Sequence, residues 1–341
     1  MEALETAGGV DPKLLKASQR EALIESAMSA AVGLNDNSQA ELEGYDLVLR
    51  LATGNVANLP RVRRRIALAL LYKGVTLSAL NRSEEEIDAY DRLLQRFGDA
   101  TEPALREHIA EALLYKGITF RQLGRSEEAI KAFDELLRRF ENADEPALRE
   151  LVCRALYNKG TALGKLDRSE KAIQTYDQLL QRFGNSTEPA FLQRVGKALV
   201  NKGVRLGALY RSDEEIGAYD EVLKRFGDAT EPALREQVAT ALVYKGLTLA
   251  QLKQGEGAIQ AYEEALKRFG DARELALRQL VAQASFNKGS ALKGLGRVDE
   301  ATRAFQDVIQ RFGSAQEESL KSYVEKARAE LGPGDSSKPA A

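Results

Sequence analysis

Several residue types that usually carry chemistry are scarce in this sequence of 341 residues. It contains one cysteine, Cys153, one histidine, His108, and no tryptophan. A single cysteine cannot form an internal disulfide, which is typical of a reducing compartment. No metal-ligand cluster, phosphate-binding glycine loop or nucleophile elbow is present. The sequence therefore predicts no metal, no cofactor and no enzymatic activity.

An excess of one charge and long apolar runs are also lacking. The 49 basic and 51 acidic side chains give a net charge of −2, which disfavours nucleic acid or a membrane surface as a partner. No stretch approaches the about 18 apolar residues of a membrane span. The first residues lack the basic segment and apolar run of a secretory signal. We expect a cytoplasmic protein.

What the sequence has instead is an internal repeat. Lys-Gly, Arg-Phe and Glu-Pro pairs each recur every 43 residues, in one common register. A fixed period of this size is the signature of a solenoid. The repeated glycines are Gly74, Gly117, Gly160, Gly203, Gly246 and Gly289. Neither helix of such a unit buries its apolar stripe alone, so stacking of successive units makes the core.

Each unit is expected to contain two helices. The first begins at a proline such as Pro103, which suits a first helical turn, and runs to about Leu123. Its expected cap is Thr101 or Asp99. The second begins at a serine such as Ser126 and ends at Arg-Phe-Gly.

Both ends of the second helix carry recognisable signals. Ser83 and Glu86 have the spacing of a capping box. The glycine after Arg-Phe, for example Gly98, suits a left-handed C-cap, although Glu141 replaces it in one unit.

The repeat register predicts the domain organisation. The parts are a flexible N-terminus (1–10), a degenerate capping repeat (11–59), six repeats (60–314), a charged capping helix (315–331) and a disordered tail (332–341).

The unit around Gly160 resembles a tetratricopeptide repeat. Gly160 matches the small residue of the family's first helix, and Ala172 and Tyr176 match the alanine and the aromatic residue of its second. The resemblance covers residues 60–331, and weakly 11–54. It implies an all-α fold, a right-handed superhelical solenoid of helical hairpins. The family's usual unit has 34 residues; here the additional residues lengthen the first helix.

The resemblance also implies a concave groove, lined by the first helices, that holds a protein or peptide segment. The position before each Lys-Gly pair carries tyrosine or asparagine, which suit peptide recognition. These residues are Tyr72, Tyr115, Asn158, Asn201, Tyr244 and Asn287. Nearby cations expected to add positive charge are Arg121, Arg154, Lys165, Lys197 and Lys293. The alternative is that the tyrosines pack between neighbouring helices.

Other polar residues have alternative interpretations. The Lys-Gly lysines could form a ribbon for a polyanion, but an acid recurs after the second-helix aromatic, which favours ion pairs within each unit. These acids are Asp91, Asp134, Asp177, Asp220 and Glu263. The run Arg61, Arg63, Arg64 and Arg65 could contact RNA or an acidic partner, but a solvated helix face is favoured. For His108 and Cys153 we favour a surface histidine and a buried apolar cysteine over a catalytic pair.

The predicted function is a protein-protein interaction scaffold that binds a partner protein or peptide. One alternative is a regulatory or sensor subunit of a bacterial, defence-related assembly that docks an effector enzyme; this rests on analogy. Another is an RNA-binding helical repeat. Self-association is left open, and the sequence names no partner.

Overall fold

The structure, a computed structural model, describes residues 11–332, and every regular element among them is a helix. The prediction of an all-α protein is confirmed. The expected flexible segment 1–10, and all but the first residue of the expected tail 332–341, lie outside the described residues. The chain divides into two compact units, Met1–Asp167 and Arg168–Ala341.

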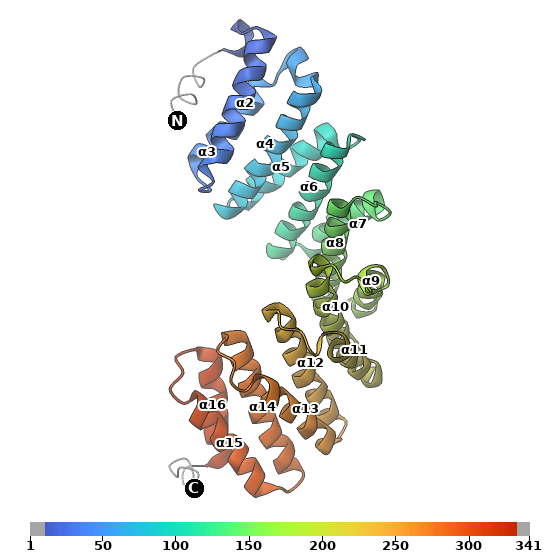
Figure 1. Ribbon diagram of the computed structural model, residues 1–341, viewed down its shortest axis with the longest axis vertical. Coiled ribbons are helices and arrows are strands. Elements are labelled where there is room, and N and C mark those ends of the chain that lie inside the picture. The colour runs from blue at the N-terminus through green and yellow to red at the C-terminus, as the bar shows by residue number, and fades with distance from the viewer. Residues whose placement is uncertain (1–10, 333–341) are drawn as a thin grey trace. The chain divides into compact units, whose positions relative to one another are not determined.

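Unit 1, Met1–Asp167, consists of helices that follow one another as antiparallel hairpins (Figure 1). Its elements are η1 (Pro12–Leu14), α2 (Ala17–Leu34), α3 (Gln39–Leu51), η2 (Gly54–Asn58), α4 (Pro60–Ala79), α5 (Ser83–Phe97), α6 (Pro103–Gln122), α7 (Ser126–Phe140) and α8 (Pro146–Lys165).

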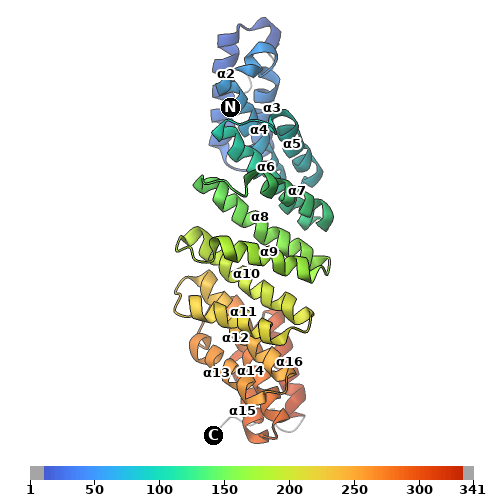
Figure 2. The same cartoon turned by 90° about the vertical axis from the view of Figure 1, so that its right-hand side faces the viewer.

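Unit 2, Arg168–Ala341, continues the same alternation of longer and shorter helices (Figure 2). Its elements are α9 (Ser169–Phe183), α10 (Pro189–Ala208), α11 (Ser212–Phe226), α12 (Pro232–Gln251), α13 (Gly255–Phe269), α14 (Leu275–Gly294), α15 (Val298–Phe312) and α16 (Glu318–Leu331). We call α4, α6, α8, α10, α12 and α14 the first helices, and α5, α7, α9, α11, α13 and α15 the second helices.

Within each unit the hairpins stack side by side. In unit 1, α6 packs against α5 and α7 and also touches the first helices α4 and α8. In unit 2, α12 packs in the same way against α11 and α13 and touches α10 and α14. Within unit 1, α5 and α7 make no comparable contact, and neither do neighbouring second helices within unit 2. The first helices therefore lie closer together, as on the inner side of a curved stack.

The repeated glycine lets a ring of the second helix approach the first helix. A Cβ atom at Gly246 would lie 2.5 Å from Cε1 of Tyr262, well inside the about 3.5–4.0 Å at which carbons pack. The ring of Phe133 crowds Gly117 in the same way. Both rings are buried. The glycine is thus a packing residue, which explains its place inside a helix, where it otherwise costs stability.

Five of the six first helices begin at the proline, as the sequence predicts, and α14 begins at Leu275. Pro103 is the first residue of α6, and its N-cap residue is Glu102. The Glu102 side chain makes no cap hydrogen bond, and none to Thr101 or Asp99 is present in the described part of the chain, so those expected caps are wrong. None of the described helices combines the length and apolarity needed to cross a membrane.

Four of the six second helices begin at the expected serine, while α13 begins at Gly255 and α15 at Val298, and their capping differs from the prediction. Ser126 is the first residue of α7, and the N-cap residue is Arg125. Its Nε donates to Glu128 Oε1 at 2.9 Å. The corresponding start of α5, at Ser83, has no side-chain cap hydrogen bond either. The expected capping box is therefore wrong, and an arginine–glutamate pair brackets the first turn instead, where an acid is favoured by the helix dipole.

The glycine after Arg-Phe is not left-handed. Gly98 has φ −50° and ψ −35°, and Glu141 at the equivalent position has φ −54° and ψ −32°. This right-handed region suits every residue type, so Glu141 is tolerated and the left-handed expectation is wrong. Left-handed residues lie instead in the turn between a first and a second helix: Asn81, Gly124, Asp167, Tyr210, Lys253 and Gly296.

Candidate functional site

The two predicted tyrosines of unit 1 pack against another aromatic ring and remain partly exposed to solvent. The ring of Tyr72 lies 6.3 Å from that of Tyr45, and Tyr72 is 38 % exposed. The ring of Tyr115 lies 6.2 Å from that of Tyr90 on α5, and Tyr115 is half-buried. Such centroid distances are typical of stabilising aromatic pairs. Each tyrosine packs on the preceding hairpin, as the alternative interpretation requires, and keeps part of its surface accessible.

Arg154 on α8 brings two predicted positions together. Its guanidinium carbon lies 5.5 Å from the centroid of the Tyr115 ring, a cation–π distance. Its backbone carbonyl accepts a hydrogen bond from Asn158 Nδ2 at 2.8 Å. The structure thus joins Tyr115, Arg154 and Asn158 across α6 and α8.

Two further predicted cations of unit 1 lie towards the ends of their helices. Arg121 on α6 is half-buried, and its Nε is buried without a hydrogen-bond partner. Lys165 is the exposed last residue of α8. Neither forms an ion pair with an acid of the described residues.

The predicted residues of unit 2 make different contacts. Asn201 Nδ2 donates to the Tyr176 hydroxyl at 3.5 Å. The ring of Tyr244 meets that of Tyr219 edge-on at 6.1 Å. Asn287 Nδ2 is buried and has no hydrogen-bond partner among the described residues. The packing alternative therefore applies to Tyr244 as it does to the tyrosines of unit 1.

The two predicted cations of unit 2 are not equivalent. Lys197 on α10 is half-buried and has no ion pair with a described acid. Lys293 on α14 pairs with Glu330 of the terminal helix α16, with Nζ 2.7 Å from Oε2. Lys293 therefore contacts the terminal helix at an exposed position, and its charge is balanced.

The Lys-Gly lysines all bind acids, but not those of their own unit. Lys245 Nζ lies 2.6 Å from Asp220 Oδ1 on α11, the second helix of the preceding hairpin. The predicted pairing within each unit is wrong by one repeat, because a second helix packs against the next first helix as well as its own. The pairs are Lys73–Asp46, Lys116–Asp91, Lys159–Asp134, Lys202–Asp177, Lys245–Asp220 and Lys288–Glu263.

Comparison with known protein families identifies the same kind of repeat as the structure does. Tetratricopeptide repeat models match residues 111–143, 154–186, 211–273 and 262–317, together about half of the chain. This chain belongs to the tetratricopeptide repeat family. Members of this family bind other proteins or peptides, so the chain is a protein-interaction or regulatory scaffold. The matching families are repeat families, not enzyme families.

Solved structures show the same fold at low sequence identity. The apo form of RapI is 11% identical, with 92% of this chain and 86% of that chain covered and a TM-score of 0.62. A tetratricopeptide repeat protein from Parabacteroides merdae ATCC 43184 is 14% identical, with 89% and 98% covered and a TM-score of 0.50. The quorum sensor NprR from B. thuringiensis, in its apo form, is 15% identical, with 89% and 78% covered and a TM-score of 0.52. A comparison with curated protein sequences gave no match. These likenesses establish the fold alone.

The single histidine of this tetratricopeptide repeat protein is not at the surface. His108 is 9% exposed on α6, which corrects the expectation of a surface residue. Its Nδ1 lies 3.2 Å from Glu111 Oε2, and its Nε2 is buried without a partner. Cys153 is fully buried on α8, as predicted.

The arginine run at the start of α4 is partly used within the fold. Arg63 reaches Glu102 at 3.2 Å, and Arg65 reaches Glu25 at 2.5 Å. Both contacts join α4 to a neighbouring part of unit 1. Arg61 and Arg64 are exposed, in keeping with the solvated helix face that the sequence favours.

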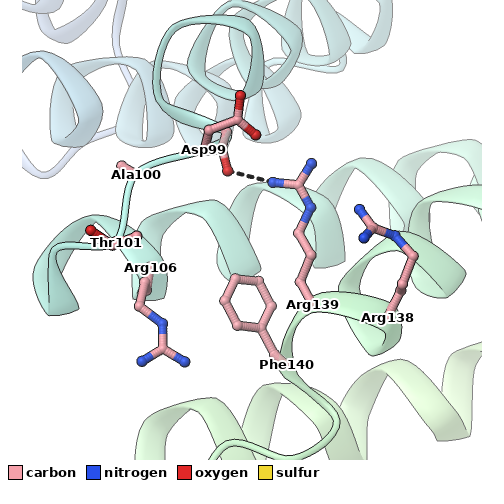
Figure 3. A pocket seen from close by; sticks show the side chains of 8 residues that line it. Asp99, Ala100, Thr101, Arg106, Arg138, Arg139 and Phe140 are labelled. Atoms are coloured by element: carbon pink, nitrogen blue, oxygen red, sulfur yellow. Dashed lines mark hydrogen bonds between the residues drawn. The ribbon is translucent and has the colours of Figure 1, made fainter.

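Units 1 and 2 each also have an open recess beside a loop that precedes a first helix, which the sequence did not reveal. In unit 1 it measures about 410 Å³, and its lining includes Arg106, Arg138, Arg139 and the ring of Phe140 (Figure 3). A similar recess in unit 2 is lined by Arg235, Lys267, Arg268 and Arg273, together with Asp271, Ala272 and Glu274. The Arg-Phe landmark was its only sequence signal.

The cations of the unit 1 recess are already paired with carboxylates. Arg106 pairs with Glu145, and Arg138 and Arg139 share Glu135. Arg139 Nη1 also donates to the Gly98 carbonyl at 2.5 Å (Figure 3). The recess is therefore a clamp between successive hairpins, and the first helices are the better candidate for a binding surface.

Proposed function

We propose that this tetratricopeptide repeat protein is an interaction scaffold whose unit 1 binds an extended acidic segment of a partner protein. The proposed surface consists of Tyr115, Arg121, Arg154, Asn158 and Lys165. The observation that supports it most is the presence of half-buried arginines without an acidic partner on the first helices.

The electrostatic argument rests on what the other cations of the first helices do. Most half-buried lysines and arginines there end on a carboxylate, as Lys116 and Arg106 do. Arg121 and Arg154 form no ion pair with the described residues, and a guanidinium shielded from water without an anion is costly. A carboxylate of a bound segment would supply the missing partner, with the fork geometry that arginine favours.

Two neighbouring side chains suit the rest of such a segment. Tyr115 offers a partly open ring beside Arg154, and the Asn158 amide can bond to a peptide backbone. The position on α6 that is equivalent to Arg154 carries an acid, Glu111, which contacts His108. The surface therefore keeps an excess of positive charge.

Unit 2 carries a second proposed surface with less charge. It consists of Lys197, Asn201, Tyr244 and Asn287, with Lys293 engaged by the terminal helix. Its amides and tyrosine suit the backbone of a peptide more than acidic side chains.

Selection from a phage-displayed library of random linear peptides tests this proposal. We expect the enriched peptides to be rich in aspartate and glutamate. The charge reversals Arg121→Glu and Arg154→Glu should each weaken their binding by at least about tenfold, because like charges would meet at the centre of the surface.

The matched control is Lys131→Glu, which makes the same charge change at an exposed position of the second helix α7. It should leave affinity nearly unchanged. Enrichment of basic or neutral peptides, or equal binding by all three variants, would contradict the proposal.

The regulatory-subunit alternative is supported by fold likeness to the quorum sensor NprR. A cytoplasmic location is likewise proposed, from the single buried cysteine. Purification of the chain with its partners from its host separates a scaffold that carries an effector enzyme from one that carries none.

A further inference from the structure

The carboxyl group of Glu86 on α5 is buried against Thr119 of α6. Glu86 is 2% exposed and occupies the position at which the next repeat has Ala129. Its Oε1 lies 2.6 Å from Thr119 Oγ1, and its Oε2 is buried without a hydrogen-bond partner. The hydroxyl groups of Ser78 and Tyr90 lie near this carboxyl, but neither makes a hydrogen bond to Oε2, and the buried Tyr90 hydroxyl itself lacks a partner. An ionised carboxylate in this setting would leave one charged oxygen without a hydrogen bond, which is costly.

The hydroxyl group of Thr119 has one proton and two neighbours that require it. Thr119 Oγ1 lies 2.9 Å from the backbone carbonyl of Tyr115 as well as 2.6 Å from Glu86. A carbonyl and a carboxylate are both acceptors, so one of the two contacts lacks a proton if Glu86 is ionised. A proton on Glu86 resolves this shortage.

Neither equivalent threonine shows both contacts. In unit 1, Thr76 Oγ1 donates to Oε2 of the buried Glu41 at 2.8 Å. In unit 2, Thr248 Oγ1 donates to the Tyr244 carbonyl at 3.0 Å, while the buried Glu215 accepts a hydrogen bond from Tyr219 at 3.1 Å. The threonine at this register thus bonds either to a carboxylate or to its own helix, and Thr119 is placed to make both contacts.

We propose that Glu86 is held as a neutral carboxylic acid that donates to Thr119 Oγ1 while Thr119 donates to the Tyr115 carbonyl, and that loss of this proton loosens the contact between α5 and α6. The chain thus contains a pH-sensitive element at one seam between repeats. It is independent of whether any peptide binds.

The surroundings of Glu86 favour the neutral form. Burial is the largest effect and raises the pKa of Glu86, while nearby hydroxyl groups lower it by less. No cation is among the groups that act most on this carboxyl. The polar and titratable groups that face Glu86 or the adjacent Tyr90 are Ser78 from α4, Thr119, Tyr115 and Glu111 from α6, and Tyr90 from α5.

The sign of the pH dependence follows from linkage. A carboxyl whose pKa is raised in the folded protein binds more protons there than in the unfolded chain. Its stabilising contribution is therefore complete below the unfolded pKa of about 4.3 and is lost as pH rises through the folded pKa. Between the two pKa values the opening equilibrium of this seam should change by up to about tenfold per pH unit.

Infrared spectroscopy of the full chain tests the protonation directly. At about pH 6, where ordinary carboxyls are ionised, the wild type should show the C=O stretch of a protonated carboxylic acid, and Glu86→Gln should lack it. The matched control Glu215→Gln should retain the band. Raising the pH should remove the band from the wild type and, in parallel, speed amide hydrogen exchange in α5 and α6.

Two results would overturn the proposal. One is a wild-type spectrum that lacks the band of a protonated carboxyl group at about pH 6 and at every lower pH down to the range in which ordinary carboxyls protonate. This result is informative without any variant. The other is a band that persists in Glu86→Gln. If amide hydrogen exchange in α5 and α6 responds to pH equally in wild type and Glu86→Gln, the proposed loosening of the contact between these helices is wrong.

Discussion

The helices α6 of unit 1 and α12 of unit 2 have the same apolar packing and different polar surroundings. Gly117 is crowded by Phe133, and Gly246 by Tyr262. Away from that contact, α6 carries Arg121 where α12 carries Ala250. The repeat thus fixes the glycine–ring contact, whereas the two proposed binding surfaces differ at the residues that vary between repeats.

The buried polar groups differ in the same way. Glu86 lies next to Thr119 in unit 1, while Glu215 accepts from Tyr219 in unit 2 and leaves Thr248 to its own helix. Similar residue types at one register therefore form two hydrogen-bond patterns. Stability measurements at paired positions can separate what the units share from what they do not.

The largest expected effect concerns the shared feature. Gly246→Ala should lower the free energy of unfolding by about 2–3 kcal/mol, because its Cβ would overlap the buried Tyr262 ring. Gly117→Ala should cost a similar amount in unit 1. Urea unfolding followed by circular dichroism measures both.

Gly217→Ala is the matched control, since a Cβ at this position in α11 would have no neighbour within 4 Å. It should stabilise the protein by about 0.5–1 kcal/mol through helix propensity. A destabilisation at Gly246 but not at Gly117 would break the likeness of the two units.

Much of this fold could be predicted from sequence because the same packing and helix-start residues recur in each repeat. The 43-residue register placed Pro103 at the start of a first helix and Ser126 at the start of a second, as the structure has them. The caps could not be predicted equally well. The Ser-x-x-Glu spacing suggested local bonding, but Glu86 is buried against Thr119 of the next hairpin, and tertiary contact outweighs local chemistry there.

The candidate site shows the same limit. The register identified Tyr115 and Asn158 as neighbours in successive first helices, and Arg154 does connect them. It did not show that Lys116 would reach back to Asp91, because a 43-residue period is equally compatible with pairing forward or backward. Only the packing of each second helix between two first helices decides this.

A smaller effect is expected at the differing threonines. Thr119→Val should lower the free energy of unfolding by about 1–2 kcal/mol, because it leaves Glu86 Oε1 as well as Oε2 without a partner. Thr248→Val removes only a bond within its own helix and should cost well under about 1 kcal/mol. Thermal and urea unfolding of both variants check this, and equal losses would mean that Thr119 does not serve Glu86.

The smallest expected effect is at the outer edge of the hairpins, in the recess of Figure 3. Glu135 accepts hydrogen bonds from Arg138 and then Arg139, and these lower its pKa to about 2. Its counterpart in unit 2, Glu264, binds Arg268 and has Lys267 where unit 1 has Arg138. A depressed folded pKa means that the stabilisation is present above the unfolded pKa of about 4.3 and is lost as pH falls towards 2.

Glu135→Gln should therefore destabilise the protein at about pH 6 and have almost no effect near pH 2. Because this carboxylate is 31% exposed, solvent screening limits the effect to below about 1 kcal/mol, and added salt should reduce it further. Glu264 binds one arginine rather than two. The loss of stability caused by Glu264→Gln should therefore differ less between the two pH values. Urea unfolding at low ionic strength measures both variants. Equal pH dependence would show that the second arginine adds nothing to the clamp, and the two recesses would then differ in sequence but not in strength.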